Sequence, residues 1–346
     1  MRFSLAILLF ASTFAAAQAT DPAAIAQYDK PDREQFLLQG AKKEGEVTVY
    51  TSLIQEDLIA LSTAFEKKYG VKVKGWRASS EKVLQRAVTE ARANRSEADV
   101  IETNGPELEA LYREKVLQPF RSPHLKDLLP QAIRPHGQWV GTRINMFVQM
   151  YNTSLVKKED VPKSYADLLQ PRWNGKLALE NDDVPWFASV VKAMGETQGV
   201  AYYRKLAANK PSMRKGHTLM AEMVAAGEIE IAIDTHVQGI ARLKEKGAPI
   251  EWKPLQPAFG QPSSVGVAAR APHPEAGRLL ADFILSREGQ EIIKSRNRVP
   301  VSRAVDSPLN KFQYRLIDPA IALDEWDKWS ALWSSIFLGG KAVAKE

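Results

Sequence analysis

The stretch "EGEVTVYTSLIQEDLIALSTAFEKKYGVKVKGW" (Glu44–Trp76) decides the fold, because it holds a strand, a helix and a second strand in sequence. Its two ends alternate β-branched and polar residues, which predicts strands. Between them, apolar residues recur at helical spacing and a glycine closes the segment, at Leu58, Leu61, Phe65 and Gly70. An amphipathic helix therefore joins the two strands.

The same alternation continues along the chain. A helix is expected at "SSEKVLQRAVTEARAN", with Ser79 or Ser80 as its N-cap. A strand, "ADVIET", and a helix, "PELEALYREKV", follow it. A second unit of the same kind starts after Asn152, and its strands include "GKLALEN" and "EIEIAID". Alternating strands and helices predict an α/β fold with an open parallel sheet, and 346 residues are enough for two lobes.

Two helical stretches are expected near the C-terminus. One is the long run "HPEAGRLLADFILSREGQEIIKS" (His273–Ser295). The other carries Trp326, Trp329, Trp333 and Ile336 at helical spacing. This stripe either lines a ligand site or docks the last helix on the body of the protein.

Residues 1–19 have the pattern of a secretory signal peptide, with Arg2, a short apolar run and the small-residue cleavage pattern Ala17-Gln18-Ala19. The apolar run is too short to span a bilayer, so no stable membrane insertion is expected. The chain has no cysteine, which excludes disulfides, thiolate metal sites, cysteine nucleophiles and a thioether lipid anchor. We expect a periplasmic location.

Composition argues against nucleic acid binding and gives little support to catalysis. The net charge is +6, and basic residues are scattered among acidic ones rather than gathered in a block. The five histidines show none of the common metal-binding spacings. A Gly-x-Ser-x-Gly elbow and a phosphate-cradling loop ending in Lys-Ser/Thr are absent too. We therefore expect no enzyme, no cofactor and no metal.

Polar residues gather where the predicted strands end. In open parallel sheets, ligands bind at the carboxyl ends of the strands, where helix N-termini offer free N–H groups. The candidate ligand-binding residues of the first unit are Thr51, Ser52, Arg77, Ser79, Ser80, Thr103 and Asn104. Those of the second unit are Asn181, Asp182, Trp186, Thr235 and His236. Trp186 either stacks on a ligand or is buried in the core, and His236 either titrates in the site or faces water.

The order of the segments resembles that of the solute-binding subunits of bacterial ABC importers, in the branch that includes ferric-iron-binding proteins. The resemblance runs from about Ala41 to about Arg303 and is carried by "AKKEGEVTVYTS", "FEKKYGVKV", "ADVIET", "LYREKVLQPF", "MYNTSLV", "WNGKLALE", "LMAEMVAAGEIEIAI", "SVGVAARAPHPEAGRLLADFILSREGQEII" and "VPVS". It implies a two-lobed, type II-like clamshell with two crossover strands, near Gln149–Thr153 and Ser263–Ala268. It also implies a monomer that works with a membrane permease and its ATPase.

The resemblance gives a division of the chain. Residues 1–19 are the signal peptide, 20–149 form lobe one with an N-terminal extension, and 150–265 form lobe two. Residues 266–305 return to lobe one, and 306–346 form a C-terminal helical segment.

The iron ligands of that branch are not retained. Their positions fall on Ile54, Asn104, Val237 and Gln238, and isoleucine and valine cannot coordinate a hard cation such as ferric ion. The arginines that hold a companion anion in that branch fall near Asn145 and Phe147, which are not basic, and Arg143 close by could substitute for them. We therefore expect a small polar or anionic organic solute, held between the lobes.

Other interpretations stay open. A metal ion could bind through an atypical set, Glu180, Asp182, Asp183 and His236. A secreted hydrolase could use Glu180 or Asp182 as its acid or base. A sensory module that serves a receptor differs only in its partner.

Overall fold

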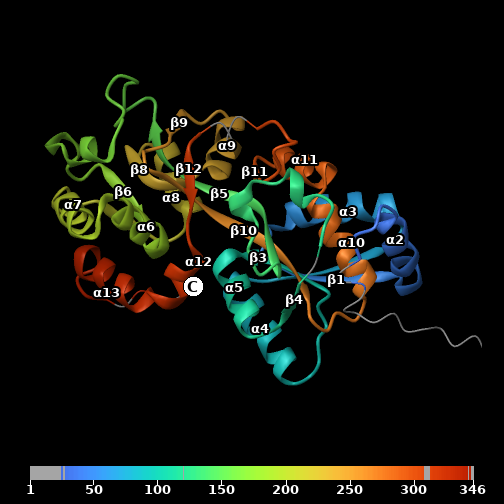
Figure 1. The fold of residues 1–346 in the computed structure, drawn as a ribbon. Helices are drawn as coiled ribbons and strands as arrows, with labels where there is room; N and C mark the ends of the chain where they lie inside the picture. Colours follow the sequence, from blue (N-terminus) through green and yellow to red (C-terminus); the bar gives the residue numbers. More distant parts are fainter. Residues whose placement is uncertain (1–24, 26–27, 120, 308–311, 342, 344–346) are drawn as a thin grey trace, which may run out of the picture.

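A computed structural model describes residues 25, 28–119, 121–307, 312–341 and 343. The expected signal peptide lies outside the described residues. Among these residues twelve strands form one sheet, whose main path runs β2-β1-β3-β10-β5-β8-β6-β7. Helices cover this sheet at both ends, and the molecule has two lobes (Figure 1).

The strands of the first lobe are β1 (Glu46–Thr51), β2 (Lys72–Arg77), β3 (Val100–Asn104) and β4 (Leu117–Gln118); its helices are α2 (Arg33–Glu44), α3 (Gln55–Tyr69), α4 (Ser80–Arg92) and α5 (Gly105–Arg113). The quoted Glu44–Trp76 stretch forms β1, α3 and β2 as expected, and β1 pairs in parallel with both β2 and β3. Ser79 caps α4 by accepting a hydrogen bond from Lys82 N at 3.4 Å.

The second lobe contains β6 (Leu177–Glu180), β7 (Ser212–Arg214), β8 (Ile231–His236) and β9 (Ile250–Lys253), with α6 (Val184–Met194), α7 (Glu196–Ala208), α8 (His217–Ala226) and α9 (Val237–Glu245). Here β6 pairs in parallel with β7 and β8. The carboxyl ends of these strands therefore share one edge, as they do in the first lobe.

Two long strands, β5 (Trp139–Asn152) and β10 (Ala258–Ala268), join the halves. β5 pairs with β10 over Trp139–Met146, then with β8 and β9 over Phe147–Asn152. β10 in turn pairs with β3 of the first lobe. The change of partners along β5 falls between Met146 and Phe147, whereas the division of the chain at residues 149 and 265 stays a prediction.

The expected long helix over 273–295 is two helices, α10 (Pro274–Leu285) and α11 (Arg287–Ser295). The break occurs at Ser286, which has extended backbone angles. Its side chain accepts a hydrogen bond from Gly289 N at 3.2 Å, so it is the N-cap of α11. The apolar residues keep helical spacing across Ser286, and a single serine within such a pattern does not by itself predict the end of a helix. The boundary between the two helices was therefore not predicted. Strand β11 (Val299–Pro300) follows and pairs with β5.

The C-terminal segment comprises β12 (Tyr314–Leu316), α12 (Pro319–Asp324) and α13 (Trp326–Phe337). Trp329 and Trp333 are fully buried, and the ring centroid of Trp333 lies 5.1 Å from that of Phe187 on α6. Docking of the last helix is thus confirmed for these two tryptophans, and the surface that receives them belongs to the second lobe (Figure 1).

Among the described helices, none has both the length and the apolar character needed to cross a membrane.

Candidate functional site

Strand ends and helix N-termini meet between the lobes. In the first lobe, α3, α4 and α5 begin just after β1, β2 and β3. In the second lobe, α6 begins shortly after β6, and α9 begins directly after β8. Helix N-termini carry unsatisfied N–H groups and a partial positive charge. The space between the lobes is therefore lined by donors from both sides.

Three adjoining cavities occupy this space, and each is named here after the helix that lines it. The α4 cavity, about 570 Å³, is lined by Ser52, Ile54, Arg77, Ala78, Ser79, Ser80, Glu81, Asn104, Glu107, Arg143, Asn145, Lys215, Gln238 and Arg298. The α9 cavity, about 470 Å³, is lined by Ile54, Asp57, Gly216, His217, Thr218, Thr235, His236, Gln238, Gly239, Arg242, Glu245, Ser295, Arg296, Asn297 and Arg298.

The α12 cavity has a volume of about 510 Å³. It is lined by Glu81, Leu84, Gln85, Asn104, Pro106, Glu107, Asn145, Asp182, Asp183, Pro185, His217, His236, Gln261, Ala322, Leu323 and Trp326. The α4 cavity shares Asn104 and Asn145 with it, and shares Gln238 and Arg298 with the α9 cavity. The three form one cleft between the lobes, and each of them is within the usual size range of small-molecule sites.

Most of the residues singled out from the sequence line this cleft. They are Ser52, Arg77, Ser79, Ser80, Asn104 and Arg143 from the first lobe, and Asp182, Thr235 and His236 from the second. The structure brings them together because parallel strands place their carboxyl ends at a common edge.

Four candidates lie behind the cleft. Thr51 and Thr103 are fully buried, and their hydroxyls donate to Glu102 Oε2 at 2.7 Å and to Ser52 Oγ at 3.0 Å. Asn181 donates to Asp182 Oδ1 at 2.9 Å. These residues position their neighbours rather than face a ligand.

Trp186 needs the clearest correction. It is 2% exposed and packs in the core, with ring centroids 6.2 Å from Phe147 and 6.1 Å from Tyr203. It does not line the cleft, so it cannot stack on a ligand there. Of the two interpretations that the sequence left open for Trp186, the structure favours burial in the core of the second lobe.

Several lining residues were not among the candidate ligand-binding residues chosen from the sequence. Asn145 and Gln238 approach each other across the cleft, and Gln238 Nε2 donates to Asn145 Oδ1 at 3.3 Å. Arg298 lies in the short connection between α11 and β11, which has no periodic pattern, and His217 begins α8, so only the tertiary fold places both of them at the cleft.

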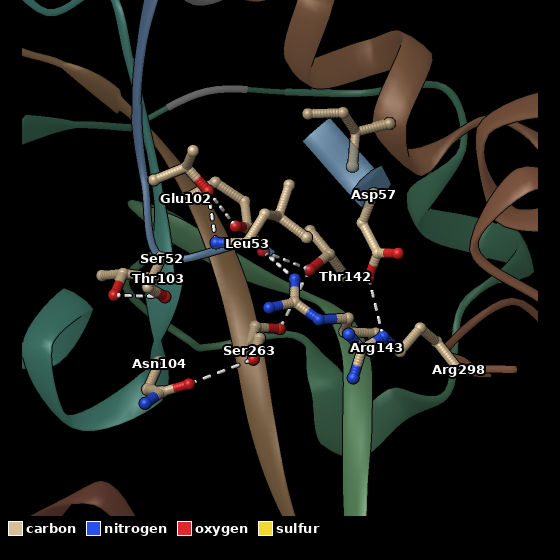
Figure 2. Close-up of polar contacts among 12 residues, drawn as sticks. Ser52, Leu53, Asp57, Glu102, Thr103, Asn104, Thr142, Arg143, Ser263 and Arg298 are labelled. Atoms are coloured by element: carbon tan, nitrogen blue, oxygen red, sulfur yellow. Dashed lines mark hydrogen bonds and ion pairs between the residues drawn. The ribbon is translucent and has the colours of Figure 1, made fainter. Parts of the chain in front are cut away.

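A buried ion pair lies beneath the α4 cavity. Figure 2 shows Arg143 of β5 reaching toward Glu102 of β3, and its Nη1 donates to Glu102 Oε1. Thr51 and Thr142 also donate to this carboxylate. Glu102 is therefore satisfied by three side chains, which suits a carboxylate that is only 1% exposed.

A second basic residue lies beside it. Arg298 Nε donates to Asp57 Oδ2 at 2.8 Å, and Arg296 Nε donates to Asp57 Oδ1 at 3.2 Å (Figure 2). Burial and the nearby Arg143 guanidinium lower the pKa of Arg298, although Asp57 acts in the opposite direction. Two guanidinium groups thus lie close together under one cavity.

The floor of the α4 cavity is a chain of side-chain hydrogen bonds. Asn104 Nδ2 donates to Ser80 Oγ at 3.0 Å. Asn104 Oδ1 accepts from Ser263 Oγ at 3.2 Å (Figure 2). This network fixes the amide of Asn104, the N-cap residue of α5.

Several buried polar atoms at the cleft have no hydrogen-bond partner among the described residues. Two of them are carboxylate oxygens, Asp182 Oδ2 and Asp183 Oδ2. Three others, which donate or accept according to their chemistry, are Arg143 Nε, Thr235 Oγ1 and His236 Nε2. Burial and the neighbouring His217 lower the pKa of His236 well below its ordinary value. Its ring is neutral at pH 7, so one ring nitrogen donates and the other accepts. Buried polar groups normally have partners, and a ligand in the cleft would supply them.

The second lobe also gathers carboxylates. Glu180 accepts from Gly216 N at 2.8 Å and from Asp182 N at 2.5 Å. Burial and the nearby Asp183 carboxylate raise the pKa of Glu180 to about 7. Glu180, Asp183 and His217 each offer one ligand atom, and these atoms lie within 4.8 Å of one another. The arrangement could accept either a proton or a cation.

A two-lobed α/β body with a polar interlobe cleft is the architecture expected from the sequence. Residues 97–320 match the family model of the bacterial extracellular solute-binding proteins, which is more than half of the chain. The chain belongs to this family.

Curated relatives of this solute-binding protein include the Fe(3+)-binding periplasmic protein of Serratia marcescens. It is 26% identical over 288 residues, which are 80% of this chain and 84% of the relative. A putative 2-aminoethylphosphonate-binding periplasmic protein of Salmonella typhimurium is 25% identical over 284 residues, 79% of this chain and 81% of the relative.

Solved structures agree on the fold. Iron-bound HitA from Pseudomonas aeruginosa superposes with a TM-score of 0.72 at 24% identity, covering 84% of this chain and 99% of that one. AfuA from Actinobacillus pleuropneumoniae, with fructose-6-phosphate bound, gives a TM-score of 0.70 at 22% identity, covering 85% and 99%. The two-lobed fold is thereby confirmed.

The family settles the class of the protein. This chain is a periplasmic solute-binding protein of the kind that serves ABC importers, and it is a binding protein rather than an enzyme. The secreted-hydrolase interpretation of Glu180 or Asp182 is therefore not supported.

Proposed function

We propose that this protein captures a small organic anion between its lobes and delivers it, as a monomer, to an ABC permease and its ATPase. The observation that carries the proposal is the set of unpartnered donors at the cleft. Arg143 Nε is buried without an acceptor, and Thr235 Oγ1 is buried without a partner among the described residues. One belongs to the first lobe and the other to the second, so a single oxyanion-bearing solute can satisfy both.

The charge of the α4 cavity supports an anion. Its basic side chains are Arg77, Arg143, Lys215 and Arg298, and its acidic ones are Glu81 and Glu107. The N-termini of α4 and α5, helices of 13 and 9 residues, add N–H groups and partial positive charge. Both the basic side chains and the helix N-termini therefore stabilise a bound anion.

The relatives point to two kinds of cargo, iron and phosphorus-bearing organic anions. Phenolate and carboxylate oxygens suit ferric ion, but no tyrosine is among the described residues that line the three cavities. The hydroxyls, amides and guanidinium groups present fit a phosphate, phosphonate or carboxylate group better.

A solute that contacts both lobes would favour the form of the protein in which the lobes are closed around it. A ligand stabilises the closed form only as far as it binds that form more tightly than the open one. A solute seated on the α4 and α5 N-termini that also reaches Thr235 and His236 does this, because those residues belong to opposite lobes.

A thermal-shift screen against small organic anions tests the proposal. A ligand at one hundred times its dissociation constant adds about 2.7 kcal/mol of stability. Thr235→Val removes the unpartnered hydroxyl at nearly constant volume, so it should keep the fold and lose most of this gain. Thr153→Val, at an exposed position outside the cleft, is the matched control. Failure of every anion to stabilise the protein, or full retention of the gain by Thr235→Val, would refute the proposal.

A cation held by Glu180, Asp183 and His217 is the second candidate, favoured by the spacing of their ligand atoms. Both oxygens of Glu180 already accept backbone hydrogen bonds, which weakens this alternative. Calorimetric titration with Zn²⁺, Mn²⁺ and ferric citrate would decide it. Loss of metal binding in His217→Ala, together with unchanged binding in the control His124→Ala, would establish the cation site.

A further inference from the structure

The C-terminal segment forms one wall of the cleft. Ala322 and Leu323 of α12 and Trp326 at the start of α13 line the α12 cavity. All three lie beyond residue 320, where the match to the family model ends.

Both lobes hold the wall in place. α12 packs against α5 of the first lobe and α6 of the second. Arg113 Nη2 of α5 donates to Asp324 Oδ2 at 3.0 Å. On the other side, Trp333 Nε1 donates to Asn181 O at 2.8 Å and fixes α13 to the second lobe. The wall is therefore a built surface and not a loose tail.

The surfaces opposite the wall are partly apolar. Leu84 of α4, Pro106 of α5 and Pro185 of α6 line the same cavity. Apolar surface from both lobes and from the C-terminal segment thus faces one space. Removing apolar area from water contributes roughly 25 cal/mol for each Å², so this space favours an apolar group.

The carboxylates named next each have at least one partner within the protein, whereas Asp183 Oδ2 has no hydrogen-bond partner among the described residues. Asp182 Oδ2 lies 3.3 Å from Lys215 Nζ, and Asp183 Oδ1 lies 3.4 Å from His217 Nε2. Glu81 Oε1 accepts a hydrogen bond from Gln85 Nε2 at 2.8 Å. These acids disfavour a second anionic group on the solute, and their partners reduce the need for a cationic one.

We infer that the solute is an organic anion with one charged end and an apolar substituent, the size of a phenyl ring or a short alkyl chain. The inference rests on the proposed function. The charged end lies in the α4 cavity and the substituent extends into the α12 cavity, against Leu323 and Trp326. The two cavities share Glu81, Asn104, Glu107 and Asn145, so one molecule can occupy both.

Calorimetry with the purified protein and matched anions tests this. The pairs are methylphosphonate with phenylphosphonate, and acetate with phenylacetate. We expect the phenyl member of the pair that binds to be at least tenfold tighter, about 1.4 kcal/mol. Leu323→Asp should remove that preference, because it replaces the apolar side chain that faces the phenyl group by a charged one.

Leu155→Asp is the matched control, because Leu155 is 49% exposed and lies outside the cleft. It should leave both affinities unchanged. Three outcomes would overturn the inference and leave the proposed function intact. They are equal affinity within each pair, tighter binding of 2-aminoethylphosphonate than of phenylphosphonate, and equal effects of the two leucine variants. Absence of binding by all these anions would overturn the proposed function, and this inference with it.

Discussion

Arg143 and Glu102 form an ion pair whose side chains are 7% and 1% exposed, at the base of the cleft between β5 and β3. Glu102 Oε2 is also bound by Thr51. The pair links the two strands next to β10, one on either side of it in the sheet. Arg143 thus has two roles, because Nη1 neutralises Glu102 while its Nε is left without a partner at the cleft.

Replacing one partner of this pair should be costly. Arg143→Met leaves Glu102 buried and without its cation, and we expect a loss of about 3–5 kcal/mol in the free energy of unfolding. Adding Glu102→Gln to it should restore part of that loss. Urea unfolding of the two single variants and the double variant gives the coupling energy, and additive losses would contradict the pairing.

The carboxylate cluster of the second lobe predicts a pH effect with a definite sign. The pKa of Glu180 is about 7 in the folded protein and about 4.5 in the unfolded chain. The folded state therefore binds this proton more tightly. Its contribution to stability is complete below about pH 4.5 and is lost as the pH rises through about 7.

Comparison with Glu180→Gln isolates the contribution that protonation of Glu180 makes to the free energy of unfolding. Between pH 4.5 and 7 the free energy of unfolding of wild type should fall relative to that of the variant, by on the order of 1–3 kcal/mol. Glu222→Gln, at an exposed position of α8, should track wild type. Parallel curves for wild type and Glu180→Gln would show that the pKa of Glu180 is not raised.

The docking of α13 predicts a local effect of one hydrogen bond. Trp333→Phe keeps an aromatic ring against Phe187 but removes the Nε1 donor to Asn181 O. We expect a loss of about 1–3 kcal/mol in the free energy of unfolding. Trp252→Phe, at a partly exposed site on β9, should cost clearly less in the same chemical-denaturation experiment.

The break between α10 and α11 predicts the effect of a cap. Ser286→Ala removes the acceptor for Gly289 N and should cost about 1 kcal/mol in the free energy of unfolding. Ser335→Ala, on the exposed face of α13, serves as the control and should change the melting temperature little. An equal change in the two variants would argue against a capping role for Ser286.

The sequence by itself determined the α/β class and the residues that stand at the ends of the strands. These depend on local patterns: alternation in β1 and β2, helical spacing in α3, and residue identity where the strands end. Such patterns are set by backbone geometry within a few residues, so they can be read without knowing which segments meet.

The tertiary structure alone decided which of those side chains face the cleft. It buried Trp186 and Thr51, and it brought in Arg298 from the connection after α11 and Leu323 from α12. The physical reason is that the cleft is formed by pairing and packing between segments more than a hundred residues apart. Such contacts are selected by the packing of the whole core, and no short stretch of the chain encodes them.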